Sequence, residues 1–192
     1  MNYWDNWYSE NSAKTAPTSF CNFCVENYVG SGSLVELGCG NGRDSTRLSD
    51  ISTVFAIDLS KEAISNIPKK EGLTGMVGEF NLIKTFANLD YVYSRFSMHC
   101  INDIDRNILL HDIYTSLKPG GLLMLEARSD RIACDVIHNN HERYLLNYAD
   151  TLKNINEIGF NIEEAAENTG LAVYSLDDKV EDPYIIRVIA KK

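Results

Sequence analysis

Short apolar runs alternate with amphipathic stretches along most of the chain. The apolar runs predict strands over residues 34–37, 52–57, 75–78, 91–94, 122–127, 171–176 and 184–190. The amphipathic stretches predict helices over residues 18–28, 43–48, 61–67, 104–117 and 147–158. Pro68, the turn at Lys118-Pro119-Gly120-Gly121 and Gly159 are expected to end helices. The alternation predicts an α/β domain in which the last two strands form an antiparallel edge.

The segment Val35-Glu36-Leu37-Gly38-Cys39-Gly40-Asn41-Gly42 joins the first strand to the next helix. Its alternating glycines let the backbone turn sharply and approach a ligand, because no Cβ intervenes. Such strand–turn–helix units commonly hold the nucleotide part of a cofactor, although a glycine cluster can also be only a tight turn. The pattern differs from G-x-G-x-x-G, and the carboxylate of Glu36 would repel a diphosphate. We therefore expect a cofactor that carries positive charge, not NAD.

The second strand ends at Asp58, twenty residues after Gly38. This spacing places a carboxylate at the tip of the neighbouring strand, where it can accept hydrogen bonds from both hydroxyls of a ribose. The glycine segment and Asp58 together predict an adenosine-binding edge. An adenosine with a sulfonium and an amino-acid tail fits this pair.

These two segments resemble the first two motifs of class I S-adenosylmethionine-dependent methyltransferases. The resemblance continues through Val77-Gly78-Glu79-Phe80, Leu89-Asp90-Tyr91-Val92-Tyr93-Ser94 and Leu117-Lys118-Pro119-Gly120-Gly121. It implies a Rossmann-like, seven-stranded, mostly parallel sheet with an antiparallel C-terminal edge and helices on both faces. It also implies S-adenosylmethionine as cofactor. The residues expected around that cofactor are Trp4, Tyr8, Ser19, Glu36, Gly38, Cys39, Gly40, Asn41, Asp58, Leu59, Glu79, Phe80, Ser94, Arg95 and Phe96.

Composition narrows the class of partner. With 192 residues, 44% of them hydrophobic, the chain is expected to form one domain over residues 1–192. The net charge of −9 argues against a nucleic-acid substrate, because proteins that bind nucleic acids need a basic face.

No apolar run is long enough to predict a membrane span. The amino end lacks a signal peptide, and the five cysteines are an odd number, so a cytoplasmic location is expected. We expect no metal site: Cys21 and Cys24 lack a second pair and fit helix packing better.

Polar residues follow the fourth and fifth strands, where an acceptor would bind. Arg95 and His99 are four apart and face the same way if a helix begins at Phe96. His99 is then a candidate base or acceptor ligand, or else a polar residue bonded to a backbone carbonyl. The fifth strand ends at Glu126-Ala127-Arg128-Ser129, where Glu126 could simply neutralise Arg128.

A narrower resemblance concerns this fifth strand and the later stretch Asn140-His141-Glu142-Arg143-Tyr144. Both segments are similar to bacterial methyltransferases of surface-polysaccharide clusters and to phosphonate O-methylating enzymes. The chain departs from that group at Glu142, where the group carries an arginine, which leaves His141 and Arg143 as candidates. The candidate catalytic residues are His99, Arg95, Arg128, His141 and Arg143. If they converge, they favour an anionic acceptor; otherwise the arginines pair with Glu126, Glu142 and Asp130 and hold loops together.

The first part of the chain, residues 1–30, is aromatic and is expected to form a helical lid over the cofactor. Trp4 and Tyr8 could offer aromatic faces to a sulfonium, or could bury one side of a short helix. Ser19 could cap the leading helix or contact the methionine carboxylate. The sequence thus predicts an O-methyltransferase for a saccharide or an anionic small acceptor, with polysaccharide biosynthesis as a possible setting. The alternatives are another metabolite, a protein or a nucleic acid as acceptor, or a cofactor-binding module without turnover.

Overall fold

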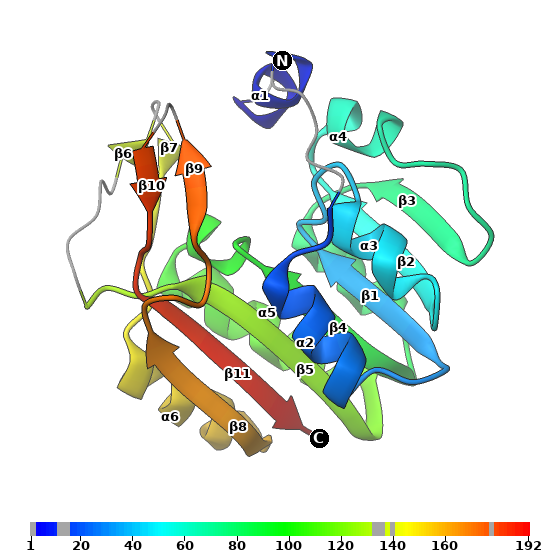
Figure 1. Ribbon diagram of the computed structural model, residues 1–192. Coiled ribbons are helices and arrows are strands. Elements are labelled where there is room, and N and C mark those ends of the chain that lie inside the picture. The colour runs from blue at the N-terminus through cyan, green and yellow to red at the C-terminus, as the bar shows by residue number, and fades with distance from the viewer. Residues whose placement is uncertain (1–2, 11–15, 132–136, 139–140, 177–178) are drawn as a thin grey trace.

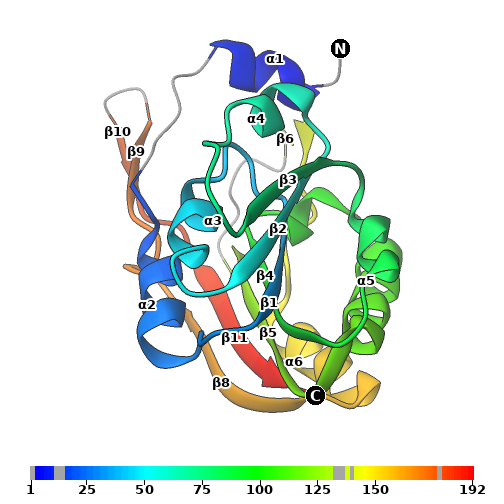
Figure 2. The ribbon, with the colours of Figure 1, turned by 90° about the vertical axis from the view of Figure 1, so that its right-hand side faces the viewer.

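A computed structural model describes residues 3–10, 16–131, 137–138, 141–176 and 179–192. The main sheet has seven strands in the order β3-β2-β1-β4-β5-β11-β8. All neighbours from β3 to β5 are parallel, whereas β11 is antiparallel to both β5 and β8. Figure 1 shows the twisted sheet with its helices, and Figure 2 shows helices on both of its faces. This is the Rossmann-like, mostly parallel architecture with an antiparallel C-terminal edge that was expected.

The strands of the main sheet are β1 (Ser33–Leu37), β2 (Thr53–Asp58), β3 (Leu73–Val77), β4 (Leu89–Arg95), β5 (Leu117–Arg128), β8 (Asn161–Asn168) and β11 (Ile185–Lys191). Two short hairpins lie outside it, β6 (Ile137–His138) with β7 (His141–Glu142) and β9 (Tyr174–Leu176) with β10 (Lys179–Glu181). The helices are α1 (Tyr3–Glu10), α2 (Ser19–Asn27), α3 (Arg43–Leu48), α4 (Lys61–Ser65), α5 (Asp103–Ser116) and α6 (Tyr148–Ile158), with the short 3-10 helices η1 (Phe80–Thr85) and η2 (Met98–Cys100).

Each face of the sheet buries its own apolar cluster, because successive strand residues point to opposite faces. Leu34 packs with α2 and α3, in a cluster that also contains the buried thiols of Cys21 and Cys24. Val35 and Leu37 pack on the other face with residues of α5 and α6. This parity places the side chain of Glu36 on the α2 and α3 face, beneath the glycine segment.

Most predicted elements are confirmed to within a few residues, and their ends have the expected caps. Thr18 accepts a hydrogen bond from the amide of Cys21 at the start of α2. Asn147 caps the start of α6, and Gly159 ends it in a left-handed conformation with φ 115°. The longer helix α5 begins after the cap Asn102.

The C-terminal part of the prediction was wrong in two respects. The strand beside β11 is β8, not residues 171–176, and of the latter segment only Tyr174–Leu176 is a strand, in the separate hairpin. β11 therefore lies inside the sheet, and β8 forms the edge. The sequence of β8 contains Glu163, Glu164 and Glu167, which hides its strand character but suits an edge that must not pair with another chain. Among the described helices, none is long and apolar enough to cross a membrane.

Candidate active site

A cavity of about 530 Å³ opens at the carboxyl ends of β1, β2, β3 and β4. This edge of a parallel sheet is where ligands bind in folds of this type. The cavity is lined by Trp4, Tyr8, Gly38, Asp58, Leu59, Gly78, Glu79, Phe80, Asn81, Lys84, Phe96, Ser97, Cys100, Ile101, Asp105, Ile108, Leu109 and Asp112.

The glycine segment forms the wall at the end of β1. Gly38 and Gly40 have φ of 73° and 55°, in the left-handed region that favours glycine. A Cβ at Gly38 would overlap the side chain of Ser97, and one at Gly40 would overlap the hydroxyl of Tyr8. The glycines therefore allow two other segments of the protein to pack closely against this loop, besides leaving room for a ligand.

Asp58 lies at the end of β2 and is held by backbone amides. Its Oδ2 accepts from the amide of Gly40 at 2.8 Å, and its Oδ1 accepts from the amide of Ser60 at 2.9 Å. Burial raises the pKa of this carboxyl, and the two amide hydrogen bonds oppose the shift. The carboxylate is thus fixed in the cavity wall.

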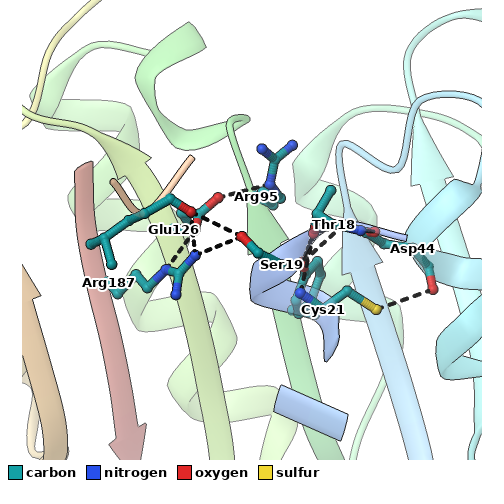
Figure 3. Close-up of polar contacts among 9 residues, drawn as sticks. Thr18, Ser19, Cys21, Asp44, Arg95, Glu126 and Arg187 are labelled. Carbon is teal, nitrogen blue, oxygen red and sulfur yellow. Dashed lines mark hydrogen bonds and ion pairs between the residues drawn. The ribbon is translucent and has the colours of Figure 1, made fainter. Parts of the chain in front are cut away.

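Glu36 faces away from the cavity and into a buried polar network. Its carboxylate accepts a hydrogen bond from the Ser45 hydroxyl of α3. The neighbouring Asp44 accepts from the amide and hydroxyl of Thr18 at 2.7 and 2.8 Å, as Figure 3 shows in part, and from Tyr93 at 2.9 Å. Burial first and Asp44 second raise the pKa of Glu36 well above its usual range. Glu36 supports the glycine segment from below and does not line the cavity.

Helix α1 covers the end of the cavity beside the glycine segment. Asp5 accepts a hydrogen bond from the Ser60 hydroxyl at 2.8 Å, and Ser60 also caps α4. Trp4 and Tyr8 line the cavity, and burial raises the pKa of the Tyr8 hydroxyl, so this group stays a neutral hydrogen-bond donor. The helix thus presents one aromatic side to the cavity.

The ends of β4 and β5 carry the arginines expected at the acceptor. The guanidinium groups of Arg95 and Arg128 lie 4.2 and 5.4 Å from the ring centroid of Phe96, which lines the cavity. Phe96 itself has φ 54°, a strained conformation for a residue with a side chain. Arg128 also forms a loose ion pair with Glu181 at 3.8 Å. Two of the predicted cations therefore meet at one aromatic ring.

Glu126 pairs with Arg95 and Arg187, not with Arg128. Figure 3 shows its carboxylate between the two, with Oε1 2.7 Å from Nε of Arg95 and Oε2 2.7 Å from Nε of Arg187. Arg187 also donates to the Ser19 hydroxyl at 3.1 Å, and Ser19 donates to the carbonyl of Leu171 at 2.9 Å. Ser19 therefore joins α2 to β11 and the chain leading to β9. The cap of α2 is Thr18, not Ser19.

His99 belongs to η2, and no helix begins at Phe96, so the predicted shared helical face with Arg95 does not form. The imidazole is buried and packs edge-on against Phe96 with 5.7 Å between centroids. Burial raises the pKa of the neighbouring Cys100 thiol to about 11, and the charge of Arg143 opposes this shift. Arg143 thus lies near the cavity wall, whereas the side chain of His141 is outside the described residues.

Arg106 of α5 ties this wall together. Its buried guanidinium donates to the carbonyls of Met98, Ile101 and Tyr144 at 3.0, 2.9 and 2.8 Å. The amide of Tyr144 in turn donates to the carbonyl of His99 at 2.8 Å. One arginine therefore fixes η2 against the segment that carries Arg143.

The structure separates the expected cofactor residues into two groups. Those that line the cavity are Trp4, Tyr8, Gly38, Asp58, Leu59, Glu79, Phe80 and Phe96. Those that do not line it are Ser19, Glu36, Cys39, Gly40, Asn41, Ser94 and Arg95. Sequence reasoning found Phe80 at the start of η1 but missed the rest of this wall, namely Asn81, Lys84 and the side of α5 where Asp112 pairs with Lys84 at 3.3 Å. The spacing of Asp105, Ile108 and Asp112 on one side of α5 is the signal that could have indicated it.

Comparisons with known proteins support the fold described above. A family model described as a methyltransferase domain matches residues 34–121. No curated protein sequence matches the chain. A structure solved for work on the conversion of a disulfide bond into a thioacetal group during echinomycin biosynthesis is 18% identical, with a TM-score of 0.77, and the match covers 98% of this chain and 90% of that one.

Two further solved structures show the same fold. An S-adenosylmethionine-dependent methyltransferase from Mesorhizobium loti is 18% identical, with a TM-score of 0.69 over 85% of this chain and 92% of that one. The 1,6-didemethyltoxoflavin-N1-methyltransferase of Burkholderia thailandensis, with bound 1,6-didemethyltoxoflavin and S-adenosylhomocysteine, is 13% identical, with a TM-score of 0.70 over 90% and 76% of the chains. At such identities the likeness shows the fold and says nothing of the acceptor.

Proposed function

Because residues 34–121 match a methyltransferase domain and the fold is that of S-adenosylmethionine-dependent methyltransferases, we propose that this chain methylates an oxygen of a small anionic acceptor. A saccharide or a phosphorylated compound is the acceptor class that we favour, with surface-polysaccharide biosynthesis as the setting. The observation that supports an anionic acceptor is the meeting of Arg95 and Arg128 at Phe96, on the wall of the cavity.

The residues of the cavity fit S-adenosylmethionine. Gly38 lines the cavity with backbone alone, and the carboxylate of Asp58 stands at the next strand end. Phe80 and Leu59 offer apolar surface for an adenine, and the acidic lining suits a ligand with a sulfonium charge. A volume of about 530 Å³ is within the usual range of small-molecule sites, about 300–1,000 Å³. The cofactor would supply an activated methyl group for in-line transfer.

In this reaction the residues of the chain mainly position the acceptor, a contribution of roughly 7–11 kcal/mol in well-oriented reactions. Arg95, Arg128 and Arg143 would hold the anionic group by charge-assisted hydrogen bonds. His99 is the candidate that the sequence offers for a base, which would be worth about 10²–10⁴-fold if the acceptor oxygen carries a proton. Its contact with Phe96 puts it beside the cavity wall.

We also propose that the chain acts as a single domain with α1 as a lid. The hydrogen bond between Asp5 and Ser60 and the lining positions of Trp4 and Tyr8 support this role. Opening of α1 would admit the cofactor, and closing would exclude water from the cavity.

Titration of the purified chain with S-adenosylhomocysteine tests the cofactor site, and absence of binding at millimolar ligand would contradict it. A methyl-transfer assay with a panel of phosphosugars, neutral sugars and small acids tests the acceptor class. We expect turnover with anionic members of the panel. Turnover of neutral sugars alone would contradict the role of the arginines. Replacement of His99 by Gln should lower kcat by at least about tenfold if it is the base, whereas an unchanged kcat would remove that role.

A further inference from the structure

The register of the sheet places one carboxylate between two guanidinium groups. Glu126 of β5 lies directly opposite Arg95 of β4 and directly opposite Arg187 of β11. Each of its oxygens accepts from one Nε at 2.7 Å, and its side chain is fully buried. Cross-strand neighbours are the pairs that a sheet fixes most directly, so this arrangement is built into the pairing of three strands.

The two arginines differ in which of their N–H donors remain available to a ligand. Arg187 uses its Nη2 as well, donating to the carbonyl of Leu171 at 2.7 Å and to Ser19 at 3.1 Å. Arg95 uses only Nε, and its terminal nitrogens form no hydrogen bond with any residue that the structure describes. Figure 3 shows these nitrogens pointing away from Glu126. Arg95 thus has the free end of a guanidinium fork beside the cavity wall at Phe96.

The charge of the three residues is unbalanced, since two cations share one anion. Burial alone would favour a neutral Glu126 and raises its pKa, but Arg95 and Arg187 oppose that shift. An ionised Glu126 leaves one net positive charge on the pair of arginines, and only Arg95 has both terminal nitrogens without a hydrogen bond to a described residue, so Arg95 is the arginine that can offer them to an anion. A planar fork of this kind fits a carboxylate or a phosphoryl group through two parallel hydrogen bonds.

We propose that Glu126 and Arg187 are positioning residues that aim the terminal nitrogens of Arg95 at an oxyanion group of the acceptor. In this arrangement Glu126 holds Nε of Arg95, and Arg187 holds Glu126 in place. The inference deepens the proposed function and rests on it for the identity of the acceptor site. Its chemistry, an oxyanion on a fixed guanidinium, can be tested without knowing the acceptor.

Replacement of Glu126 by Gln distinguishes a positioning role from a purely electrostatic role, because the two roles predict opposite changes in the affinity for an anion. The change removes a negative charge next to Arg95, so electrostatics alone would strengthen anion binding. Loss of the charged partner of Nε releases the guanidinium, so a positioning role requires weaker binding, by about tenfold. The two explanations therefore predict opposite results.

The experiment uses the full chain saturated with S-adenosylhomocysteine and two probes, sulfate for a phosphoryl group and acetate for a carboxylate. The Nε–Hε resonance of Arg95 in ¹⁵N-labelled protein is the readout, assigned with the Arg95→Lys variant. Arg187→Gln is the second test variant, in case Glu126→Gln does not fold. Asp50→Asn is the matched control, because Asp50 also pairs with two cations, Arg47 and Lys70, but on the surface.

We expect saturable binding of sulfate or acetate to the wild-type chain and to the Asp50 variant. Binding should weaken about tenfold in both the Glu126 and Arg187 variants. Preference for sulfate would indicate a phosphorylated acceptor, and preference for acetate a carboxylate. Absence of binding by either probe, or tighter binding in Glu126→Gln, would overturn the inference. Failure of the proposed function has a different signature, namely no binding of S-adenosylhomocysteine.

Discussion

The two halves of the sheet's carboxyl edge hold their charged groups in different ways. In the half proposed for the cofactor, Asp58 is fixed by the backbone amides of Gly40 and Ser60. In the half proposed for the acceptor, Arg95 is fixed by the side chain of Glu126, which is itself held by Arg187. Backbone amides are present whatever the side chains are, whereas an ion pair between side chains is lost with one substitution. The position of Asp58 therefore depends less on the identity of its neighbours than the position of Arg95 does.

The halves also differ in charge. The cavity wall carries Asp58, Glu79, Asp105 and Asp112 against Lys84, whereas Arg95 and Arg187 share Glu126 at the ends of β4 and β11. An acidic cavity favours a sulfonium, and a basic rim favours an anion. The net charge of −9 is therefore not evenly distributed, because the two regions favour ligands of opposite charge.

The largest effect on the free energy of unfolding is expected from a change at Gly38, in the half of the edge that backbone amides hold in place. Gly38→Ala places a Cβ against Ser97 and forces a residue with a side chain to keep φ 73°. The free energy of unfolding should fall by about 2–5 kcal/mol, the sum of overlap and backbone strain. Gly170→Ala is the control, because Gly170 has φ 76° but open space around it, so only about 1–2 kcal/mol should be lost. Equal losses in urea denaturation would contradict the close packing at Gly38.

The next effect concerns the acceptor half. Arg106→Met leaves three backbone carbonyls without their charged donor and frees η2 from the segment at Tyr144. We expect a loss of about 2–4 kcal/mol in the free energy of unfolding. Arg47→Met, which removes only an exposed ion pair with Asp50, should cost less than about 1 kcal/mol. A loss no larger than that of the control would show that η2 is held by other contacts.

Cofactor affinity gives a third comparison. Asp58→Ala should weaken binding of S-adenosylhomocysteine by about 1–3 kcal/mol, through lost ribose contacts and a released Gly40 amide. Isothermal titration calorimetry measures this directly, with Asp50→Ala as a surface control. Unchanged affinity would place the ribose elsewhere.

Tyr8→Phe tests the role of α1, and its expected effect on cofactor affinity is smaller. The variant keeps the ring that covers the cavity and removes only the hydroxyl next to Gly40. Affinity for S-adenosylhomocysteine should fall by about 0.5–1.5 kcal/mol if this hydroxyl donates to the cofactor. Tyr114→Phe is the control, because Tyr114 does not line the cavity and packs against Phe160. Equal affinities for both variants would reduce α1 to a packing role.

The smallest effect is a gain in stability. Because the pKa of Glu36 is raised in the folded chain, this carboxyl lowers stability progressively as pH rises from its ordinary pKa in the unfolded chain toward its pKa in the folded chain. Glu36→Gln should therefore raise Tm near neutral pH, by about 2–4 °C for each kcal/mol gained. The gain should shrink as pH falls, because the wild-type carboxyl is then protonated in both states. A Tm difference that does not depend on pH would contradict a buried, destabilising charge.

How much of the fold and of the site could be predicted from the sequence depends on how far apart along the chain the contacting residues lie. The hydrogen bond between Gly40 and Asp58 spans 18 residues within one strand–helix–strand unit, and both residues were predicted. The pair of Arg187 and Glu126 spans 61 residues and depends on which strands are neighbours. Since the strand order at the C-terminal edge was predicted wrongly, Glu126 was matched with Arg128, two positions along the same strand.

Two other outcomes have similar causes. Glu36 was expected at the cofactor, but the alternation of side chains along β1 already places it on the face opposite Val35 and Leu37. Phe80 at the start of η1 was predicted, but the wall residues after it and those of α5 were missed because they come from segments without a recognisable motif. Helix α3, in contrast, was predicted with its observed ends, because a glycine turn and a local apolar pattern suffice to define it.

The left-handed backbone at Phe96 has a consequence for any effort to engineer this chain. Glycine would relieve the strain there, by about 1 kcal/mol. The same replacement would delete the ring between Arg95 and Arg128 and its edge contact with His99, so the loss of packing opposes the relief of strain. The measured stability of variants at position 96 would therefore be a misleading guide to improvement at this site.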